Sequence, residues 1–146
     1  EISECLVGSE MCIRDSYSAL GESDEKMLLA RAIQMFMPGK PQIWYLDLFA
    51  GKNDHEAVQR AGESGHKEIN RTNISVDQIA EGLKKDVVQK QLALIRMRNT
   101  HKAFSEGAEV TISGEESSLE IRWEYDGAYA ELHVNFEEGT YTIESN

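Results

Sequence analysis

The chain has 146 residues, of which 40% are hydrophobic, and it carries a formal net charge of −11 at pH 7. The length favours one domain or part of one, and the hydrophobic fraction excludes a disordered chain because it can supply a core. The negative charge argues against nucleic acid and membrane surfaces as partners. No apolar run in the sequence approaches the length that crosses a bilayer.

Residues 1–16 resemble the translated read-through of a cloning or sequencing adaptor, so we expect an adaptor-derived or disordered stretch and exclude it from fold prediction. The alternative is a genuine strand or terminal loop. Both cysteines, Cys5 and Cys12, lie in this stretch. The cysteine count therefore says nothing about the redox compartment of the protein.

A helix is predicted over residues 23–37. Ser23 can cap its beginning, and Asp24 and Glu25 suit the positive end of the helix dipole. Its apolar residues cover more than one stripe, which indicates packing on a large neighbour. These residues are Met27, Leu28, Ala30, Ile33, Met35, Phe36 and Met37.

Pro38-Gly39 ends this helix, and residues 42–46 are then predicted to form a short buried strand. A long polar loop follows, between residues 47 and 72. Loops of this length are uncommon and usually functional or disordered. The order helix, strand, long loop, helix is one step of a β/α architecture, and in a β/α barrel the loop after a strand carries active-site residues.

Two further helices are predicted, over 75–83 and 86–101. Ser75-x-x-Gln78 has the form of a capping box, and Asp86 can cap the longer helix. Basic residues gather near the end of the longer helix. We interpret them as complementing the helix dipole rather than as a phosphate site. They are Arg96, Arg98, His101 and Lys102.

Residues 105–146 alternate between apolar and polar side chains, which predicts four antiparallel strands. Asp126-Gly127 is a two-residue hairpin signal, and residues 137–139 make the next turn. This segment holds eleven acidic residues against a single lysine or arginine, Arg122. We interpret the acidity as a solvated outer surface, and we expect Trp123 and Tyr125 to be buried against the last helix.

Without a family, the sequence offers no complete catalytic set. No nucleophile-elbow pattern or glycine-rich phosphate loop is present in the sequence. The four histidines have no metal-ligand spacing and are expected to be surface or sheet residues. They are His55, His66, His101 and His133. We predict neither a metal site nor a cofactor.

Five motifs in order resemble the sucrose phosphorylase family, a branch of the α-amylase superfamily of glycoside hydrolases. They are Tyr17-Ser18-Ala19-Leu20-Gly21, residues 28–34, Pro38-Gly39-Lys40-Pro41-Gln42, Ala50-Gly51-Lys52-Asn53-Asp54 and Ile69-Asn70-Arg71. The sequence of residues 44–49 and 65–68 resembles that of family members acting on sucrose 6′-phosphate more than that of members acting on plain sucrose.

The resemblance implies a fold class of α/β plus β. Residues 17–104 would be the last strand and helices of a (β/α)8 barrel, and residues 105–146 a C-terminal antiparallel β-domain. The family's reaction is retaining glucosyl transfer, with an Asp nucleophile and a Glu acid/base, and phosphate in place of water in the second step. These carboxylates lie upstream in the family. The resemblance therefore implies a C-terminal fragment with no catalytic residue of its own, inactive alone.

The resemblance also implies the substrate-binding residues. Arg71 matches an arginine that helps to hold the glucosyl unit, because a planar guanidinium suits both a carboxylate and a pair of hydroxyls. Asn70 would fix the turn, while His66 and Lys67 are candidates for binding an acceptor phosphate. For Lys67 the alternative is a solvated loop lysine. A sugar and phosphate are the expected partners, and the expected location is cytoplasmic.

Two other functions stay open at this stage. Within enzymes, the chain could belong to a glucosylglycerate phosphorylase or to a plain glucoside hydrolase of the same superfamily. Outside catalysis, residues 105–146 could be a carbohydrate-binding or packing module. Exposure of Trp123 and Tyr125 beside a groove would favour sugar binding, and burial of both would favour packing.

Overall fold

The structure is a computed structural model that describes residues 16–61 and 72–146. Its contacts divide the chain into two compact units. The first unit contains the described residues of 1–27 and 43–88, and the second contains residues 28–42 and 89–146. Within the described ranges, no helix is long and apolar enough to cross a membrane.

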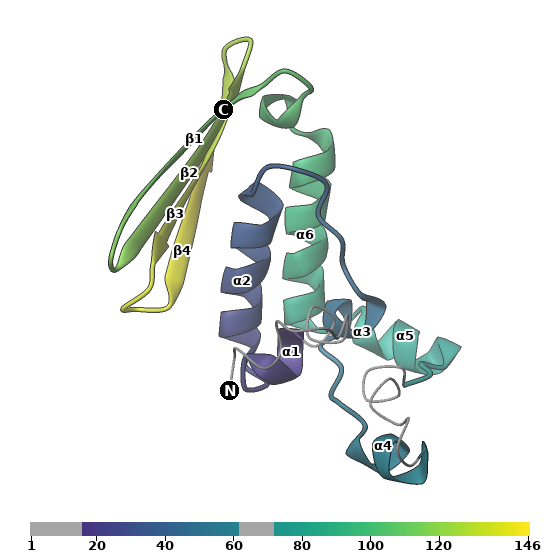
Figure 1. Cartoon of the computed structure of the whole chain (residues 1–146). Coiled ribbons are helices and arrows are strands. Elements are labelled where there is room, and N and C mark those ends of the chain that lie inside the picture. Colours follow the sequence, from purple (N-terminus) through teal and green to yellow (C-terminus); the bar gives the residue numbers. More distant parts are fainter. Residues whose placement is uncertain (1–15, 62–71) are drawn as a thin grey trace. The chain divides into compact units, whose positions relative to one another are not determined.

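Figure 1 traces the course of the chain. Helices make up the first part, and they are α1 (Ser16–Ala19), α2 (Asp24–Phe36), α3 (Tyr45–Leu48), α4 (His55–Ala61), α5 (Val76–Gly82) and α6 (Asp86–Thr100). A short 3-10 helix, η4 (Lys102–Phe104), leads into the strands. The strands are β1 (Glu109–Glu115), β2 (Ser118–Tyr125), β3 (Ala128–Asn135) and β4 (Thr140–Ser145).

The helix predicted over 23–37 is confirmed as α2. The Ser23 hydroxyl accepts a hydrogen bond from the Lys26 backbone N–H at 3.3 Å, so Ser23 caps the helix as expected. The carboxylates of Asp24 and Glu25 lie in the first turn. Local capping chemistry therefore sets the beginning of this helix.

The strand predicted over residues 42–46 is wrong. Residues 41–44 have no regular structure, and α3 begins at Tyr45. An apolar run this short cannot be assigned to helix or strand by periodicity alone. A parallel strand also needs neighbouring strands for its backbone hydrogen bonds, and the strands among the described residues all belong to the antiparallel sheet.

The two later helices are confirmed as α5 and α6. At α5 the Ser75 hydroxyl accepts from the Gln78 N–H at 3.2 Å, and the Gln78 side chain accepts from the Ser75 N–H at 2.8 Å. Both halves of the predicted capping box are therefore present. Asp86 is the first residue of α6, which ends at Thr100.

The four strands form one antiparallel sheet in the order β1-β2-β3-β4. Asp126 and Gly127 link β2 to β3 with φ of 46° and 78°, the left-handed values of a type I′ turn. At the next turn, Asn135 Oδ1 accepts from the Glu138 N–H at 3.0 Å and Gly139 has a φ of 65°. Both predicted hairpins are confirmed, because turn chemistry is local.

The core of the second unit joins the sheet to the helices. Its buried apolar residues on the sheet are Ile121, Trp123, Ala130, Leu132 and Val134, and those on the helical part include Leu28, Ala32, Met35, Phe36, Leu94 and Ala103. The Trp123 indole N–H donates to the Phe36 carbonyl at 2.6 Å. The Phe104 ring packs edge-on against Phe36, 5.3 Å between centroids.

The expectation for the two sheet aromatics is half right. Trp123 is 7% exposed, as expected, whereas Tyr125 is 36% exposed. Tyr125 is the last residue of β2, beside the turn at Asp126, and less of the unit covers it there. An indole that is buried and hydrogen-bonded to Phe36 is a packing residue rather than a sugar platform.

The basic residues near the end of α6 make contacts within the second unit. Arg98 Nη2 donates to the Gly39 carbonyl at 3.1 Å, and Lys102 Nζ pairs with Asp126 at 2.6 Å. His101 Nδ1 accepts from the Ala103 N–H at 3.2 Å and its Nε2 lies 3.1 Å from the main-chain oxygen of Asn146. These contacts support a structural interpretation of the cluster.

Candidate functional site at the base of the long loop

The segment predicted as one long loop is interrupted, because α3 reaches Leu48 and α4 occupies His55–Ala61 within it. The remaining loop leaves α3 through a tight turn at Ala50 and Gly51. Ala50 has a φ of 49°, and the Gly51 N–H donates to the Leu46 carbonyl at 2.8 Å. A Cβ on Gly51 would lie 2.4 Å from Leu46 Cδ1, closer than real carbon atoms approach. A side chain at position 51 would therefore have to displace the Leu46 side chain, and the turn fixes the direction in which Lys52, Asn53 and Asp54 leave the helix.

Two hydrogen bonds tie this turn to α1. The buried carboxylate of Asp47 accepts from the Tyr17 N–H at 3.1 Å, and the Asn53 N–H donates to Ser18 Oγ at 3.3 Å. Lys52 adds an exposed ion pair with Glu22 at 2.5 Å. Residues 17–22, which are distant in sequence, therefore hold the first end of the loop.

Tyr17 is itself held by a carboxylate. Its hydroxyl donates to Asp24 Oδ1 at 2.9 Å, and only 7% of the residue is exposed. Burial, with help from this hydrogen bond, raises the pKa of Tyr17 from 10.0 to about 12. The phenol accordingly stays neutral at physiological pH and serves as a packing residue and hydrogen-bond donor.

Asp54 begins α4. Its Oδ1 accepts from the Ala57 N–H at 2.8 Å, and Arg60 lies 3.5 Å from both the Asp54 and Glu56 carboxylates. The Asp54 carboxylate is thus used as a helix cap.

The second end of the loop is anchored on α3. The Tyr45 hydroxyl donates to the Thr72 carbonyl at 2.9 Å. Thr72 directly follows Arg71 in the sequence. Both ends of the loop are therefore fastened to the same short helix: one through Leu46 and Asp47, the other through Tyr45.

A pocket of about 310 Å³ lies between the two loop ends and α5. Its lining is Leu46, Phe49, Gly51, Lys52, Thr72, Asn73, Ile74, Gln78, Glu81, Gly82 and Lys85. The Lys85 ammonium donates to the Phe49 carbonyl at 3.3 Å. A Cβ on Gly82 would lie 2.6 Å from Phe49 Cδ1, so glycine lets α5 approach this ring.

The pocket offers few hydrogen-bonding groups. Among the described residues, the buried Thr72 hydroxyl has no hydrogen-bond partner. Lysine, asparagine and glutamine residues are also part of the pocket lining. The lining exposes more apolar than polar surface, so it does not favour a hydroxylated ligand.

The predicted substrate-binding residues His66, Lys67, Asn70 and Arg71 lie outside the described residues. Their roles stay predictions. Sequence reasoning missed Tyr45 and Thr72, which anchor the loop. The only sequence signal at this base was the Gly51 motif, because a bond between a side chain and a carbonyl 27 residues away leaves no local pattern.

No protein-family model matches the chain. Similarity to individual proteins is high. The sucrose 6(F)-phosphate phosphorylase of Ilumatobacter coccineus is 50% identical over 127 residues, which are 87% of this chain and 24% of that protein. The glucosylglycerol phosphorylase of Marinobacter adhaerens is 37% identical over 119 residues, 82% of this chain and 24% of that protein.

A solved structure is similar as well. The crystal structure of sucrose 6F-phosphate phosphorylase from Thermoanaerobacter thermosaccharolyticum superposes with a TM-score of 0.81 at 41% identity. The match covers 88% of this chain and 26% of that structure. The chain thus spans about a quarter of the length of the relatives that it matches.

Helices followed by a small four-stranded antiparallel sheet, superposing on that structure, define the C-terminal part of an α-amylase-type enzyme. More particularly, the chain matches a C-terminal portion of the sucrose phosphorylase family.

Proposed function

We propose that the chain is the C-terminal part of a retaining glucosyl phosphorylase. The whole enzyme would convert sucrose or sucrose 6′-phosphate, with inorganic phosphate, to α-glucose 1-phosphate and fructose or its phosphate. The observation that carries the proposal is the identity of 40% and 50% to two sucrose 6(F)-phosphate phosphorylases over nearly nine-tenths of the chain. These two relatives favour the phosphorylated sugar as substrate.

The proposed chemistry needs two carboxyl groups from outside this chain. An aspartate would attack the glucosyl carbon and form a covalent intermediate, while a glutamate protonates the leaving oxygen. Phosphate then takes the glucosyl unit. Because both carboxyl groups are proposed to lie in the preceding part of a longer protein, this chain alone is inactive. We place the enzyme in the cytoplasm, where phosphate and phosphorylated sugars are at hand.

The part of this chain in the reaction is to hold Arg71 at the glucosyl site. The anchored base of the loop supports this role, because the Tyr45 hydroxyl holds the carbonyl of the residue that follows Arg71. A guanidinium fork can bind a carboxylate of the preceding part and two sugar hydroxyls together. Asn70 would fix the turn, and His66 and Lys67 would reach the acceptor phosphate.

A second candidate acceptor has its own support. The glucosylglycerol phosphorylase relative is 37% identical to this chain, so a glycerol-type acceptor is the alternative to fructose. It would share the glucosyl site and differ only in the acceptor contacts. Sugar binding by residues 105–146 is disfavoured and a packing role is favoured, because Trp123 is buried and bonded to Phe36.

A hybrid enzyme can test the role of Arg71. Residues 17–146 would replace the matching C-terminal part of the crystallised relative, which is 41% identical. In this hybrid Arg71→Lys should lower kcat/KM more than about tenfold for every acceptor, because one ammonium cannot replace a bidentate fork and the glucosyl unit is common to all. The matched control is Arg60→Lys, since Arg60 is exposed and pairs only with loop and helix carboxylates among the described residues.

The acceptor residues are tested in the same hybrid. If Lys67 binds the acceptor phosphate, Lys67→Gln should weaken the binding of sucrose 6′-phosphate and leave the binding of sucrose unchanged. If Lys67→Gln has the same kinetics as the unsubstituted hybrid on each of the two sugars, Lys67 is a solvated loop residue. Near-normal rates for Arg71→Lys on both sugars would remove the proposed role of that arginine.

A further inference from the structure

The turn between β2 and β3 carries the one aspartate in the sequence that a glycine follows, Asp126. Asp126 and Gly127 are both exposed, so water reaches the turn. Asp126 has a φ of 46°, a left-handed value that costs more for a residue with a Cβ than for glycine. An aspartyl-glycine bond in this conformation and in contact with water is chemically reactive.

Such a bond rearranges with water as the only co-reactant. The Gly127 amide nitrogen attacks the side-chain carboxyl carbon of Asp126, and the carboxyl hydroxyl leaves as water with the amide hydrogen. Water then opens the resulting succinimide ring at either carbonyl carbon. Opening at the side-chain carbonyl restores aspartate, whereas opening at the main-chain carbonyl leaves isoaspartate, in which the main chain runs through the side-chain carboxyl. Glycine favours the attack because no Cβ hinders its nitrogen.

Lys102 binds the carboxyl group that must react. Its Nζ lies 2.6 Å from Asp126 Oδ2 and 3.4 Å from the main-chain oxygen of Asp126. One ammonium thus contacts both oxygen-bearing groups of this residue, and the rotation that brings them into a ring breaks these contacts. The hydrogen bond and the charge of Lys102 also lower the pKa of Asp126. An ionised carboxyl has no hydroxyl to lose as water, so the ion pair opposes the reaction in a second way.

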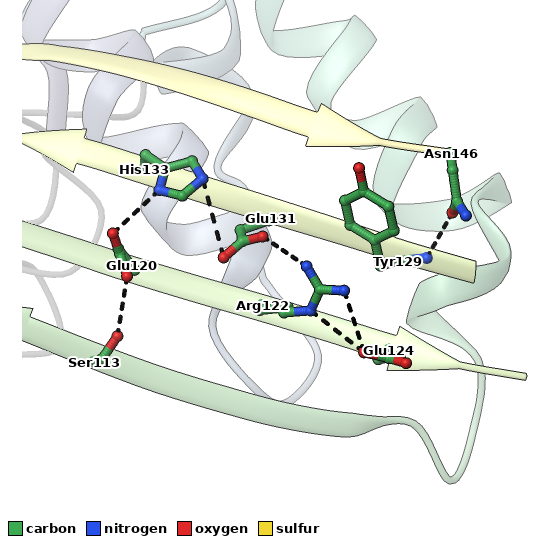
Figure 2. Close-up of polar contacts among 8 residues, drawn as sticks. All are labelled: Ser113, Glu120, Arg122, Glu124, Tyr129, Glu131, His133 and Asn146. Carbon is green, nitrogen blue, oxygen red and sulfur yellow. Dashed lines mark hydrogen bonds and ion pairs between the residues drawn. The ribbon is translucent and has the colours of Figure 1, made fainter. Parts of the chain in front are cut away.

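Asn146 holds the turn on the other side of the reacting bond. Its Nδ2 donates to the Gly127 carbonyl at 3.1 Å, and its Oδ1 accepts from the Tyr129 N–H at 2.8 Å. Figure 2 shows the second of these bonds. Attack requires the Gly127 nitrogen to turn towards the Asp126 side chain. Because Lys102 and Asn146 bind the backbone before and after that nitrogen, both resist the movement.

We propose that Asp126-Gly127 is a modification site at which isoaspartate forms, and that Lys102 and Asn146 slow its formation by holding the turn. The change inserts one more carbon into the main chain of a turn whose flanking residues, Tyr125 and Ala128, pair directly. Isoaspartate would therefore open this end of the β2–β3 hairpin. The site lies in the second unit and is independent of the proposed function.

Incubation of the whole chain in water enriched in heavy oxygen tests this site. Each passage through the ring introduces one oxygen atom from the solvent, so peptide mapping by mass spectrometry should find the label and isoaspartate at Asp126. In guanidinium chloride, which unfolds the turn, the labelling should be more than about fivefold faster than in native buffer at the same pH. This comparison uses the parent chain and does not depend on any variant folding.

Variants separate the two contacts that hold the turn. Lys102→Met keeps an unbranched side chain without the ammonium, and it should speed the labelling of the folded chain by about two- to fivefold, as expected for loss of an exposed ion pair. Lys84→Met is the matched control, because Lys84 pairs with Glu81 at the same separation of 2.6 Å, and it should label at the parent rate. Asn146→Ala removes the side-chain bonds to the turn and should speed the labelling by at least about twofold.

Three results would overturn the proposal. The first is that no label reaches Asp126 in the unfolded chain, and the second is that the folded chain is labelled as fast as the unfolded one. The third is that either Lys102→Met or Asn146→Ala is labelled no faster than Lys84→Met.

Discussion

The Arg98 guanidinium lies over two aromatic rings of the second unit. Its carbon is 4.2 Å from the centre of the Trp123 ring and 4.7 Å from that of Phe104. Burial lowers the pKa of Arg98, but an arginine pKa begins so high that the charge persists at neutral pH. The residue thus acts as a charged packing element between the end of α6 and the sheet.

This contact predicts the effect of a conservative change. Arg98→Lys should lower the free energy of unfolding by about 1–2 kcal/mol, because a compact ammonium loses the stacking on both rings and the planar fork. Arg96→Lys is the matched control: Arg96 is exposed on the same helix, and its change should be within about 0.5 kcal/mol. Urea unfolding measures both. Equal losses for the two variants would show that the stacking contributes nothing particular.

Tyr17 predicts how stability depends on alkaline pH. Its folded pKa is raised from 10.0 to about 12, so above pH 10 the unfolded chain releases a proton that the folded chain keeps. Stability is therefore full below pH 10 and falls as the pH rises towards 12. Tyr17→Phe should make this fall shallower, and the remainder includes Tyr141, whose pKa burial also raises. Identical pH profiles of stability would contradict the assignment.

At the scale of elements, α5 depends on its capping box. Ser75 and Gln78 satisfy each other's backbone N–H groups on a helix of seven residues. Ser75→Ala should cost about 1 kcal/mol of stability. Gln78→Ala should cost less, and the double variant should cost less than both together because each half of the box supports the other. Additive losses in a double-mutant cycle would show two independent contacts.

Elements with local signals were predictable from the sequence. Ser75-x-x-Gln78, Ser23 and Asp126-Gly127 each mark an end or a turn within a few residues, and all three are confirmed. The prediction of a strand over residues 42–46 was wrong, because a short apolar run is compatible with both a helix and a strand. A parallel strand also needs neighbouring strands from other parts of a protein. The exposure of Tyr125 was not predictable for a similar reason. Alternation shows which face of a strand a residue lies on, but not whether other elements of the fold bury that residue.

Long-range pairs left no signal in the sequence. Glu120 and His133 lie thirteen residues apart, and only the register of β2 against β3 brings them together. The bond from Tyr45 to Thr72 is likewise invisible in spacing. The candidate sugar-binding residues His66, Lys67, Asn70 and Arg71 came from family resemblance rather than from the pattern of the chain.

At the scale of the whole molecule, the chain provides a segment that is held on α3 at both ends, and in our account the carboxyl groups of the proposed reaction come from outside this chain. It spans about a quarter of the length of its relatives. Both ends of the loop are held on α3, and the acidic sheet packs on the helices of the second unit through Trp123 and Phe36. In our account the preceding part of a longer protein supplies catalysis, and this part supplies Arg71.

The most direct measurement is the rate at which the hybrid enzyme forms glucose 1-phosphate from sucrose 6′-phosphate and inorganic phosphate. The comparison is the same relative truncated before the replaced part. The account predicts turnover by the hybrid, dependence of the product on phosphate, and no product from the truncated relative or from this chain alone. A hybrid that unfolds cooperatively yet forms no glucose 1-phosphate, or an isolated chain that forms it, would contradict the account.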